Sequence, residues 1–215
     1  MQTILITGFE PFGGDAVNPS MEAVRALASY RTEGIRVAVA PLPVSAQRIE
    51  AALREALEAH RPDVVMAVGQ AGGRAEMSVE RVAINVDDFR IPDNAGDQLV
   101  DEPVVAGGPA AYFSTLPIKA MVRRMRDAGV PANVSQTAGT FLCNHVFYLV
   151  RHLAETEFRG IRAGFIHVPA LPEQAARNPG QSSMALETIV TGLKVAIETV
   201  RDVTTDLRVS EGQTH

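Results

Sequence analysis

The sequence contains a single cysteine, Cys143, and its surroundings make it a candidate nucleophile. It lies in the stretch SQTAGTFLCNHVFY, where an apolar segment and a glycine-containing turn precede a helix that we expect from Asn144 onward. Free backbone N–H groups at a helix N-terminus favour an anion, lower the pKa of a thiol from about 8.5 toward neutrality, and can stabilise an oxyanion. A buried structural cysteine is the alternative, and the position alone leaves both interpretations open.

A thiolate nucleophile requires a base, and His167 is the best placed of five histidines. It ends the apolar stretch AGFIHVP, a predicted strand, and functional residues of open α/β sheets gather at the carboxyl ends of strands. His145 is only two residues from Cys143 on the same predicted helix, so its side chain should point elsewhere. The alternative for His167 is a structural, hydrogen-bonded residue at a strand end.

A third group is needed to orient the imidazole, and Glu80 is a candidate for this role. It stands near the start of an alternating segment, Val79–Asp87, which predicts a strand. A carboxylate at a strand end can reach into a site. The alternative is a surface charge or an ion-pair partner, and the neighbouring Arg81 is consistent with either.

The glycine-rich segment TGFEPFGG follows the first apolar segment and contains Phe9 and Phe12. Its glycine spacing matches neither the P-loop nor the dinucleotide-binding fingerprint. Two phenylalanines in such a loop suit a flat apolar slot for a small planar ligand. A turn with two core anchors is the alternative.

Short apolar segments alternate with longer amphipathic segments along the chain. The predicted strands of this kind are Thr3–Thr7, Val37–Ala40, Asp63–Val68 and Ala163–Val168, and Val134–Thr137 resembles a further strand. Polar residues that can cap the predicted helices are Asn18, Ser45, and Ser114 or Thr115. This alternation predicts an α/β fold with a mostly parallel sheet covered on both faces. Such a sheet could bring His167 and Cys143 together at one edge.

Two segments depart from this alternation. The stretch Ile91–Gly108 is rich in Pro, Asp, Asn and Gly, which predicts a long loop or hairpin, and loops of this length are often functional. The polar residues from about 203 to 215 predict a frayed tail. We otherwise expect one domain over residues 1–215, without a linker or an internal repeat.

Composition excludes several classes of protein. The chain has 215 residues, with 20 basic and 25 acidic side chains, and its net charge of −5 argues against a nucleic-acid partner. No apolar run reaches the length of about 18 residues that a membrane span requires. One cysteine excludes an internal disulfide and a Cys-based zinc site within one chain. Because the N-terminus does not resemble a signal peptide, we expect a cytoplasmic protein that does not act on membranes.

Taken together, these stretches resemble the pyroglutamyl peptidase I (pyrrolidone-carboxylate peptidase) family of cysteine peptidases. The stretches that match are GFEPFGG with Asn18-Pro19-Ser20, GQAGGR followed by ERVAIN, SQTAGTFLCNH, and GFIHVPALPEQ. They occur in the family's order and at about the expected spacing, from about residue 3 to about residue 200. The joint match is highly specific, although no single motif is.

The resemblance implies roles for particular residues. The family's catalytic Glu, Cys and His fall on Glu80, Cys143 and His167. The positions that match the family's substrate pocket are Phe9, Phe12, Gln70 and Leu142, with Ile91 and Phe141 as further walls. Arg90 matches a family arginine near the active site, where it would support the oxyanion together with the backbone N–H of Cys143.

The resemblance also implies a reaction, a fold and an assembly. The family's members are omega peptidases, exopeptidases that hydrolyse the amide bond after an N-terminal pyroglutamyl (5-oxoproline) residue of peptides through an acyl-enzyme. Nothing in this mechanism requires a metal or a cofactor. The implied fold is a three-layer α/β/α sandwich with a mostly parallel, mixed central sheet. The implied assembly is a homodimer or homotetramer.

Two positions depart from the family's pattern. Ala170 follows His-Val-Pro where many members carry an aromatic residue, which predicts a more open leaving-group side. Gln136 stands where Asn is more common. Neither touches the three catalytic positions, so these departures concern the rate and the preference for the second residue.

Three other functions remain as alternatives. A thiol amidase acting on a related lactam or acyl-amide would use the same residues. A catalytically silent protein could use the aromatic slot to bind a lactam, although the presence of all three triad residues argues against it. A nucleoside phosphorylase on a similar sandwich is the weakest alternative, since no phosphate or ribose motif is evident.

Overall fold

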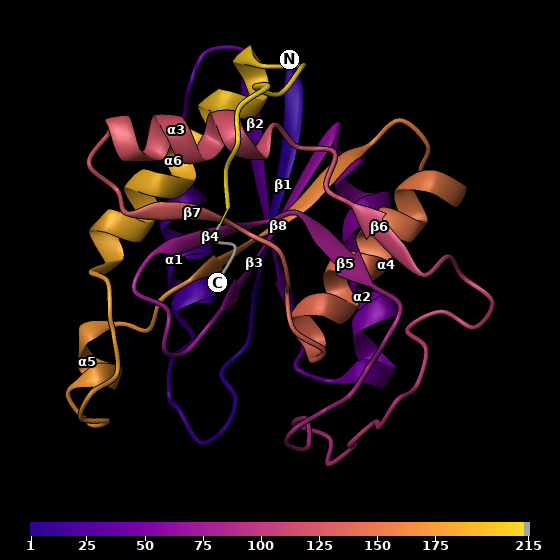
Figure 1. Ribbon diagram of the computed structural model, residues 1–215. Coiled ribbons are helices and arrows are strands. Elements are labelled where there is room, and N and C mark those ends of the chain that lie inside the picture. The colour runs from indigo at the N-terminus through magenta and orange to yellow at the C-terminus, as the bar shows by residue number, and fades with distance from the viewer. Residues whose placement is uncertain (213–215) are drawn as a thin grey trace.

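A six-stranded mixed sheet forms the centre of the protein in a computed structural model that describes residues 1–212 (Figure 1). The strand order is β2-β1-β3-β8-β4-β7. The four parallel strands are β1 (Gln2–Phe9), β2 (Ile35–Leu42), β3 (Val64–Gln70) and β8 (Arg162–Val168). Next to them, β4 (Met77–Glu80) pairs antiparallel with β8, and β7 (Ala132–Ser135) runs parallel to β4. The predicted mostly parallel, mixed sheet is therefore confirmed.

Helices cover both faces of this sheet and complete three layers (Figure 1). One hydrophobic cluster joins the sheet to α1 (Pro19–Leu27), α3 (Ile118–Asp127) and α6 (Leu186–Asp202). A second cluster joins the opposite face to α2 (Ala46–His60) and α4 (Leu142–Thr156). Burial on both faces explains why β1, β3 and β8 are almost continuously apolar rather than alternating.

The alternating segment Val79–Asp87 does not form one strand. It divides at Arg81, after which β5 (Val82–Ile84) pairs antiparallel with β6 (Ala111–Phe113) in a separate two-stranded sheet. The N–H of Arg81 donates to Ser135 O at 2.9 Å in the central sheet, and its carbonyl accepts from Ser114 N at 2.8 Å beside the small sheet. Arg81 is thus the point at which the chain passes from one sheet to the other.

Two of the predicted helix caps are replaced by distant side chains. Asn18 caps α1 as predicted, because its side chain accepts from Ser20 N. Ser45 makes no capping bond to α2, and the carboxylate of Asp93 accepts from Ala46 N at 2.8 Å instead. For α3, the N-cap residue is Pro117 rather than Ser114 or Thr115. The carboxylate of Asp206 accepts from Lys119 N and Ala120 N there, at 3.1 Å and 3.0 Å.

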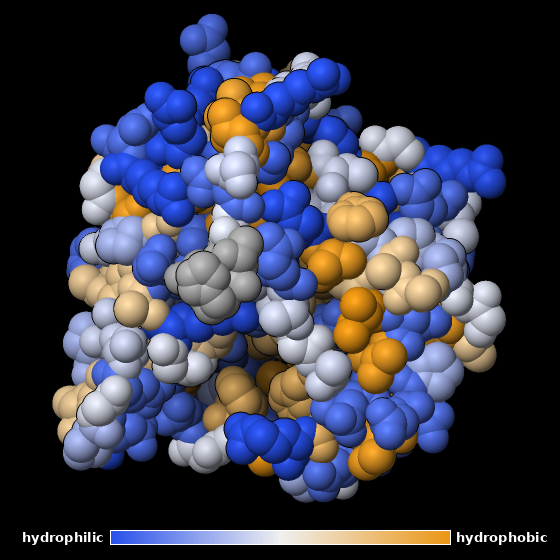
Figure 2. Space-filling model, in the orientation of Figure 1, coloured by the Kyte–Doolittle hydropathy of each residue, from blue (hydrophilic) through white to orange (hydrophobic). Residues whose placement is uncertain are grey.

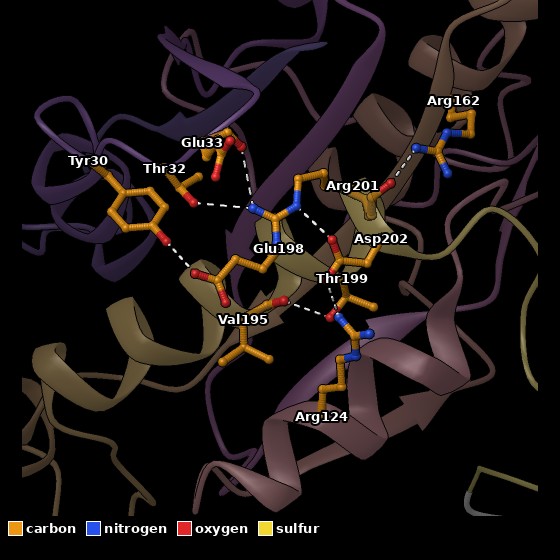
Figure 3. Close-up of polar contacts among 11 residues, drawn as sticks. Tyr30, Thr32, Glu33, Arg124, Arg162, Val195, Glu198, Thr199, Arg201 and Asp202 are labelled. Atoms are coloured by element: carbon orange, nitrogen blue, oxygen red, sulfur yellow. Dashed lines mark hydrogen bonds and ion pairs between the residues drawn. The ribbon is translucent and has the colours of Figure 1, made fainter. Parts of the chain in front are cut away.

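The end of the chain is more ordered than its composition predicts, as far as residue 212. The segment 203–212 has no regular secondary structure, but Asp206 caps α3, and Glu211 forms an ion pair with Arg126 at 3.1 Å. The last turns of α6 are also held in place (Figure 3): Glu198 accepts from the hydroxyl of Tyr30 at 2.7 Å, and Asp202 pairs with Arg124 at 2.9 Å. The rest of the predicted tail, 213–215, lies outside the described residues.

The surface over the small sheet is apolar (Figure 2). Ile84 of β5 and Phe113 of β6 are both exposed there.

Within residues 1–212, no helix is both long enough and apolar enough to cross a membrane.

Candidate active site

Three separate elements meet where β3 and β8 end, on the sheet face that α4 covers. His167 lies near the carboxyl end of β8 and is paired in register with Gly69 of β3. Cys143 lies at the start of α4, directly after its first residue, Leu142. Glu80 is the last residue of β4. The structure thus brings all three predicted catalytic residues to one place.

The contact between His167 and Glu80 follows from the register of the antiparallel strands. Ser78 lies opposite His167, so Glu80, two residues further along β4, is a diagonal neighbour on the same face. Its Oε1 is 2.7 Å from His167 Nδ1, and the two side chains are only 0% and 5% exposed. Because an ionised carboxylate can only accept, Nδ1 of the imidazole carries the proton and Nε2 is left as the acceptor. The surface interpretation of Glu80 is therefore wrong.

The thiol of Cys143 occupies space that a side chain at Gly69 would fill. A Cβ built on Gly69 would lie 2.8 Å from Cys143 Sγ and 2.8 Å from Phe165 Cζ. Gly69 is the register partner of His167, and the rings of Phe165 and His167 are 4.8 Å apart. The missing side chain therefore lets the sulfur approach the sheet at the position next to the imidazole.

The predicted low pKa of the Cys143 thiol is not what the site produces. Burial raises the pKa of this thiol to about 12; the negative charge of Glu80 adds to the rise, and the positive charge of Arg74 opposes it. The helix N-terminus is present as predicted, and its N-cap residue, Phe141, makes no side-chain capping bond. Because the pKa is raised, the resting thiol is neutral and needs a base.

A small pocket opens beside the sulfur. Its lining residues are Phe9, Phe12, Asn18, Val44, Gln70, Phe141, Leu142 and Cys143. Five of the six predicted pocket residues are among them; Ile91 is the exception, and Asn18 and Val44 were missed. In the view of Figure 2, apolar side chains lie along the lower border of the hollow below the centre of the molecule, and hydrophilic ones lie above it.

The aromatic residues form a packed wall of this pocket. The ring of Phe141 lies 6.3 Å from that of Phe12 and 4.7 Å from that of Phe89, the latter edge to face. Phe9 and Phe89 are almost fully buried, whereas Phe12 and Phe141 remain partly exposed. The pocket thus presents aromatic surface supported from behind, as the TGFEPFGG segment predicts.

A buried glutamine that the sequence reasoning did not single out fixes the polar edge of the pocket. Gln174 lies on the short helix α5 (Pro172–Ala175), and its Oε1 accepts from Leu171 N at 2.9 Å. Its Nε2 donates to Asp15 Oδ2 at 2.7 Å and to Gln70 Oε1 at 3.4 Å. Because the Asp15 carboxylate can only accept, the orientation of both amides is determined. The stretch GFIHVPALPEQ contains Gln174, but only the fold shows its partners.

Arg74 is a second residue that the sequence reasoning missed. Its Nη1 donates to Glu80 Oε1 at 2.7 Å, and its Nη2 donates to Thr137 O at 3.1 Å. Arg81, the partner suggested by adjacency, instead donates to Gln136 Oε1 at 2.8 Å. The available signal was the stretch GQAGGR, in which Arg74 is the last residue.

The segment after β5 lies against the start of α4 without forming a strand. Asp87 is buried and its Oδ2 is 2.6 Å from His145 Nδ1, so the side chain of His145 points away from Cys143, as predicted. Arg90 is exposed and forms no hydrogen bond or ion pair with another of residues 1–212. The structure therefore does not link Arg90 to the triad by a contact.

The two departures from the family's pattern lie in different surroundings. Ala170 is fully buried and its carbonyl accepts from Met184 N at 2.9 Å, so the residue itself borders no open surface. Gln136 lines a surface groove together with Arg74. Among the described residues, no group of three or more His, Cys, Asp or Glu side chains is arranged to hold a metal ion.

Comparisons with known proteins agree on one family. The family model for pyroglutamyl peptidase matches residues 2–203. The pyrrolidone-carboxylate peptidase of Cupriavidus taiwanensis is 60% identical over 216 residues, with 100% of both chains covered. The crystal structure of pyroglutamyl peptidase I from Bacillus amyloliquefaciens matches with a TM-score of 0.95 and 44% identity, covering 97% of this chain and 99% of that one. Pyrrolidone carboxyl peptidase from Thermococcus litoralis matches with a TM-score of 0.94 and 36% identity, covering 98% and 100%.

Proposed function

The chain belongs to the pyroglutamyl peptidase family, and we propose that Cys143, His167 and Glu80 are the triad with which it removes N-terminal pyroglutamate from peptides. It is a cysteine peptidase of the omega type. The observation that carries the assignment of the triad is the buried His167–Glu80 contact of 2.7 Å beside the thiol that lies over Gly69.

Acylation begins with the neutral thiol. Nε2 of His167 takes the proton of Cys143 as Sγ attacks the carbonyl carbon that joins pyroglutamate to the next residue. Glu80 holds Nδ1 and stabilises the imidazolium that forms. Because burial raises the pKa of the thiol to about 12, proton transfer and attack are expected to occur together rather than from a stable thiolate.

The negative oxygen formed by this attack lies at the N-terminus of α4. The backbone N–H of Cys143 stabilises it there, with the helix dipole in support. Arg90 is a further proposed donor, because the adjacent Phe89 packs against the pocket wall at Phe141. His167 then protonates the leaving amine as the C–N bond breaks. A water molecule, deprotonated by His167, hydrolyses the thioester and releases pyroglutamate.

The pocket suits the pyroglutamyl ring by shape and by polarity. The ring is flat and apolar on its faces, and Phe12 and Phe141 offer partly exposed aromatic surface for it. Its lactam has one N–H and one carbonyl, and Gln70 and Leu142, which line the pocket, are proposed to bind them through their backbone groups. An N-terminal residue with a charged amine would have to lose its hydration in this slot, which disfavours ordinary peptides.

We also propose that the protein is cytoplasmic and forms a homodimer or homotetramer. The apolar surface at Ile84 and Phe113 supports self-association, because exposed apolar patches commonly mark interfaces. Light scattering coupled to size exclusion would measure the assembly, and a monomeric mass at micromolar concentration would contradict this part of the proposal.

Turnover of matched substrates tests the proposed specificity. Pyroglutamyl, prolyl and glutamyl anilides differ in the ring and in the lactam carbonyl, so their kcat/KM values separate shape recognition from lactam recognition. We expect the pyroglutamyl anilide to be strongly preferred. Preference for either of the other two anilides would contradict the substrate assignment while leaving the triad intact.

A further inference from the structure

We propose that Arg74 is a positioning residue of the active site, which acts through Glu80 to hold His167 in the tautomer that accepts the thiol proton. This inference rests on the proposed triad. Arg74 does not reach the reacting atoms in this arrangement. Its guanidinium contacts Glu80, which holds the imidazole of His167. It also contacts the turn that leads to Cys143.

The geometry around Glu80 is the first observation. Oε1 of Glu80 lies 2.7 Å from both His167 Nδ1 and Arg74 Nη1. Its Oε2 is buried and has no hydrogen-bond partner in the described part of the chain. The side chain of Glu80 is 0% exposed, whereas that of Arg74 is 30% exposed. Arg74 thus reaches inward from the loop after β3 to a carboxylate that water does not reach.

The charges that face Glu80 are few. His167 approaches from β8, Arg74 from the loop after β3, and the thiol of Cys143 from α4. On its other edge, β4 pairs with β7, which contains no ionisable side chain. When His167 is neutral, as a general base must be, Arg74 is therefore the one cation among the described residues in contact with this carboxylate.

The chemical consequence follows from the cost of burying an unpaired charge. Without a cation, a buried carboxyl group favours its neutral form. A neutral Glu80 could donate its own proton to Nδ1, and the imidazole would then carry its proton on Nε2. That tautomer cannot accept the proton of Cys143. Arg74 prevents this by keeping Glu80 an acceptor.

The second contact of Arg74 links Glu80 to the segment that carries Cys143. Nη2 donates to the carbonyl of Thr137, in the turn between β7 and α4. This turn is locked by its own bonds, since Ser135 Oγ donates to Thr137 O at 3.0 Å and Gly139 N donates to Thr137 Oγ1 at 3.0 Å. One guanidinium therefore spans the end of β4 and the segment that leads to Cys143. Its positive charge also lowers the pKa of the thiol against the effect of burial.

The test compares Arg74→Gln with Arg74→Lys and with Arg81→Gln as the matched control. Arg81 is also an arginine near β4, but its guanidinium binds Gln136 and the carbonyl of Glu211 rather than Glu80. We expect Arg74→Gln to lower kcat at neutral pH by about tenfold or more while KM changes much less. Arg74→Lys should recover part of kcat, because it keeps the charge without the two-pronged contact.

Two further measurements separate positioning from a merely structural role. In Arg74→Gln the acid limb of the kcat/KM profile should move to higher pH, because an unpaired carboxyl group takes up a proton more readily. The alkylation rate of the single thiol by iodoacetamide at neutral pH should fall in parallel. In a Glu80→Gln background, Arg74→Gln should cost less than it does in the wild type, since the part of its effect that passes through Glu80 is already lost.

The outcomes distinguish this inference from the proposed function. If Cys143→Ser keeps full turnover, the triad itself is wrong. If Cys143→Ser is inactive but Arg74→Gln retains the wild-type pH profile and alkylation rate, only the role of Arg74 is wrong. An undiminished effect of Arg74→Gln in the Glu80→Gln background would also overturn it. Circular dichroism will show whether Arg74→Gln folds. If it does not, Arg74→Lys takes its place in the test. A wild-type pH profile and an unchanged kcat in Arg74→Lys would then contradict the role of the two guanidinium contacts.

Discussion

At the scale of single residues, the smallest side chain in the site sets its geometry. Gly69 leaves the space into which the sulfur of Cys143 and the ring of Phe165 project, and it lies beside His167 in the sheet. Glycine is required here for close approach rather than for an unusual backbone conformation. The nucleophile on the helix can approach the base on β8 because the neighbouring strand, β3, has no side chain at this point.

Gly69→Ala should therefore impair catalysis without changing any reacting group. The added Cβ would lie 2.8 Å from Sγ, so the thiol or the Phe165 ring must move. Displacement of a reacting atom by about 1 Å can cost on the order of 100-fold in rate, and we expect a fall in kcat of at least about tenfold. Gly72→Ala is the matched control, because its Cβ would meet nothing closer than 3.6 Å. Equal kcat values in the two variants would contradict this role of Gly69.

The thiol itself should titrate at unusually high pH. Burial and the charge of Glu80 raise the pKa of Cys143 to about 12, so the neutral form predominates at every pH below that value. The rate of alkylation of the free enzyme should therefore keep rising through the alkaline range, beyond the value of about 8.5 for an ordinary cysteine. Iodoacetamide kinetics from pH 6 to the limit of stability measure this. A plateau already reached below pH 7 would instead show a preformed thiolate–imidazolium pair.

At the scale of helices and strands, the sequence predicts the elements better than their ends. The strands β1, β2, β3 and β8 follow from short, branched apolar runs, although β2 is only partly buried, and the cap of α1 follows from Asn18. The division of Val79–Asp87 into β4 and β5 does not, because the switch at Arg81 depends on hydrogen bonds to Ser135 and Ser114 far along the chain. Local patterns contain no information on such partners.

The cap of α2 shows the same limit and gives a stability test. Asp93 accepts from Ala46 N, and its other oxygen accepts from Ala95 N and Asp97 N, whereas the buried Ser45 Oγ has no partner among the described residues. Loss of a helix cap costs about 0.5–2 kcal/mol, so Asp93→Ala should lower the free energy of unfolding by about this amount or more. Ser45→Ala should be close to neutral, since it removes an unpaired buried hydroxyl. Urea denaturation of both variants measures this, and a larger loss in Ser45→Ala would contradict the assignment.

At the scale of the whole molecule, the mixed sheet decides which distant residues meet. The antiparallel pairing of β4 with β8 places Glu80 diagonally opposite His167, and the crossover through α4 returns Cys143 to the same edge. The identities of these three residues could be predicted from motifs in the sequence. Their contacts, the pairing of Arg74 with Glu80, and the support of Gln70 by Gln174 could not, because each joins segments whose relative position only the fold determines.

The C-terminal tail also has contacts that the sequence alone does not predict. Polar composition alone predicts that residues after 203 fray, yet Asp206 and Glu211 bind α3 through charges that are visible in the sequence but unassignable without the fold. The raised pKa of the Cys143 thiol could not be predicted for the same reason. The position of Cys143 at the start of a helix can be predicted from the sequence, whereas the burial that raises its pKa depends on the fold.

The most direct test of the account is the turnover of a chromogenic pyroglutamyl amide as its one thiol is alkylated. The chain has a single cysteine, so the labelled fraction by intact mass equals the fraction of blocked Cys143. We predict that activity falls in proportion to that fraction and that Cys143→Ala and Cys143→Ser have no turnover while folding normally. Full activity in fully alkylated protein, or in Cys143→Ala, would contradict the assignment of Cys143 as the nucleophile.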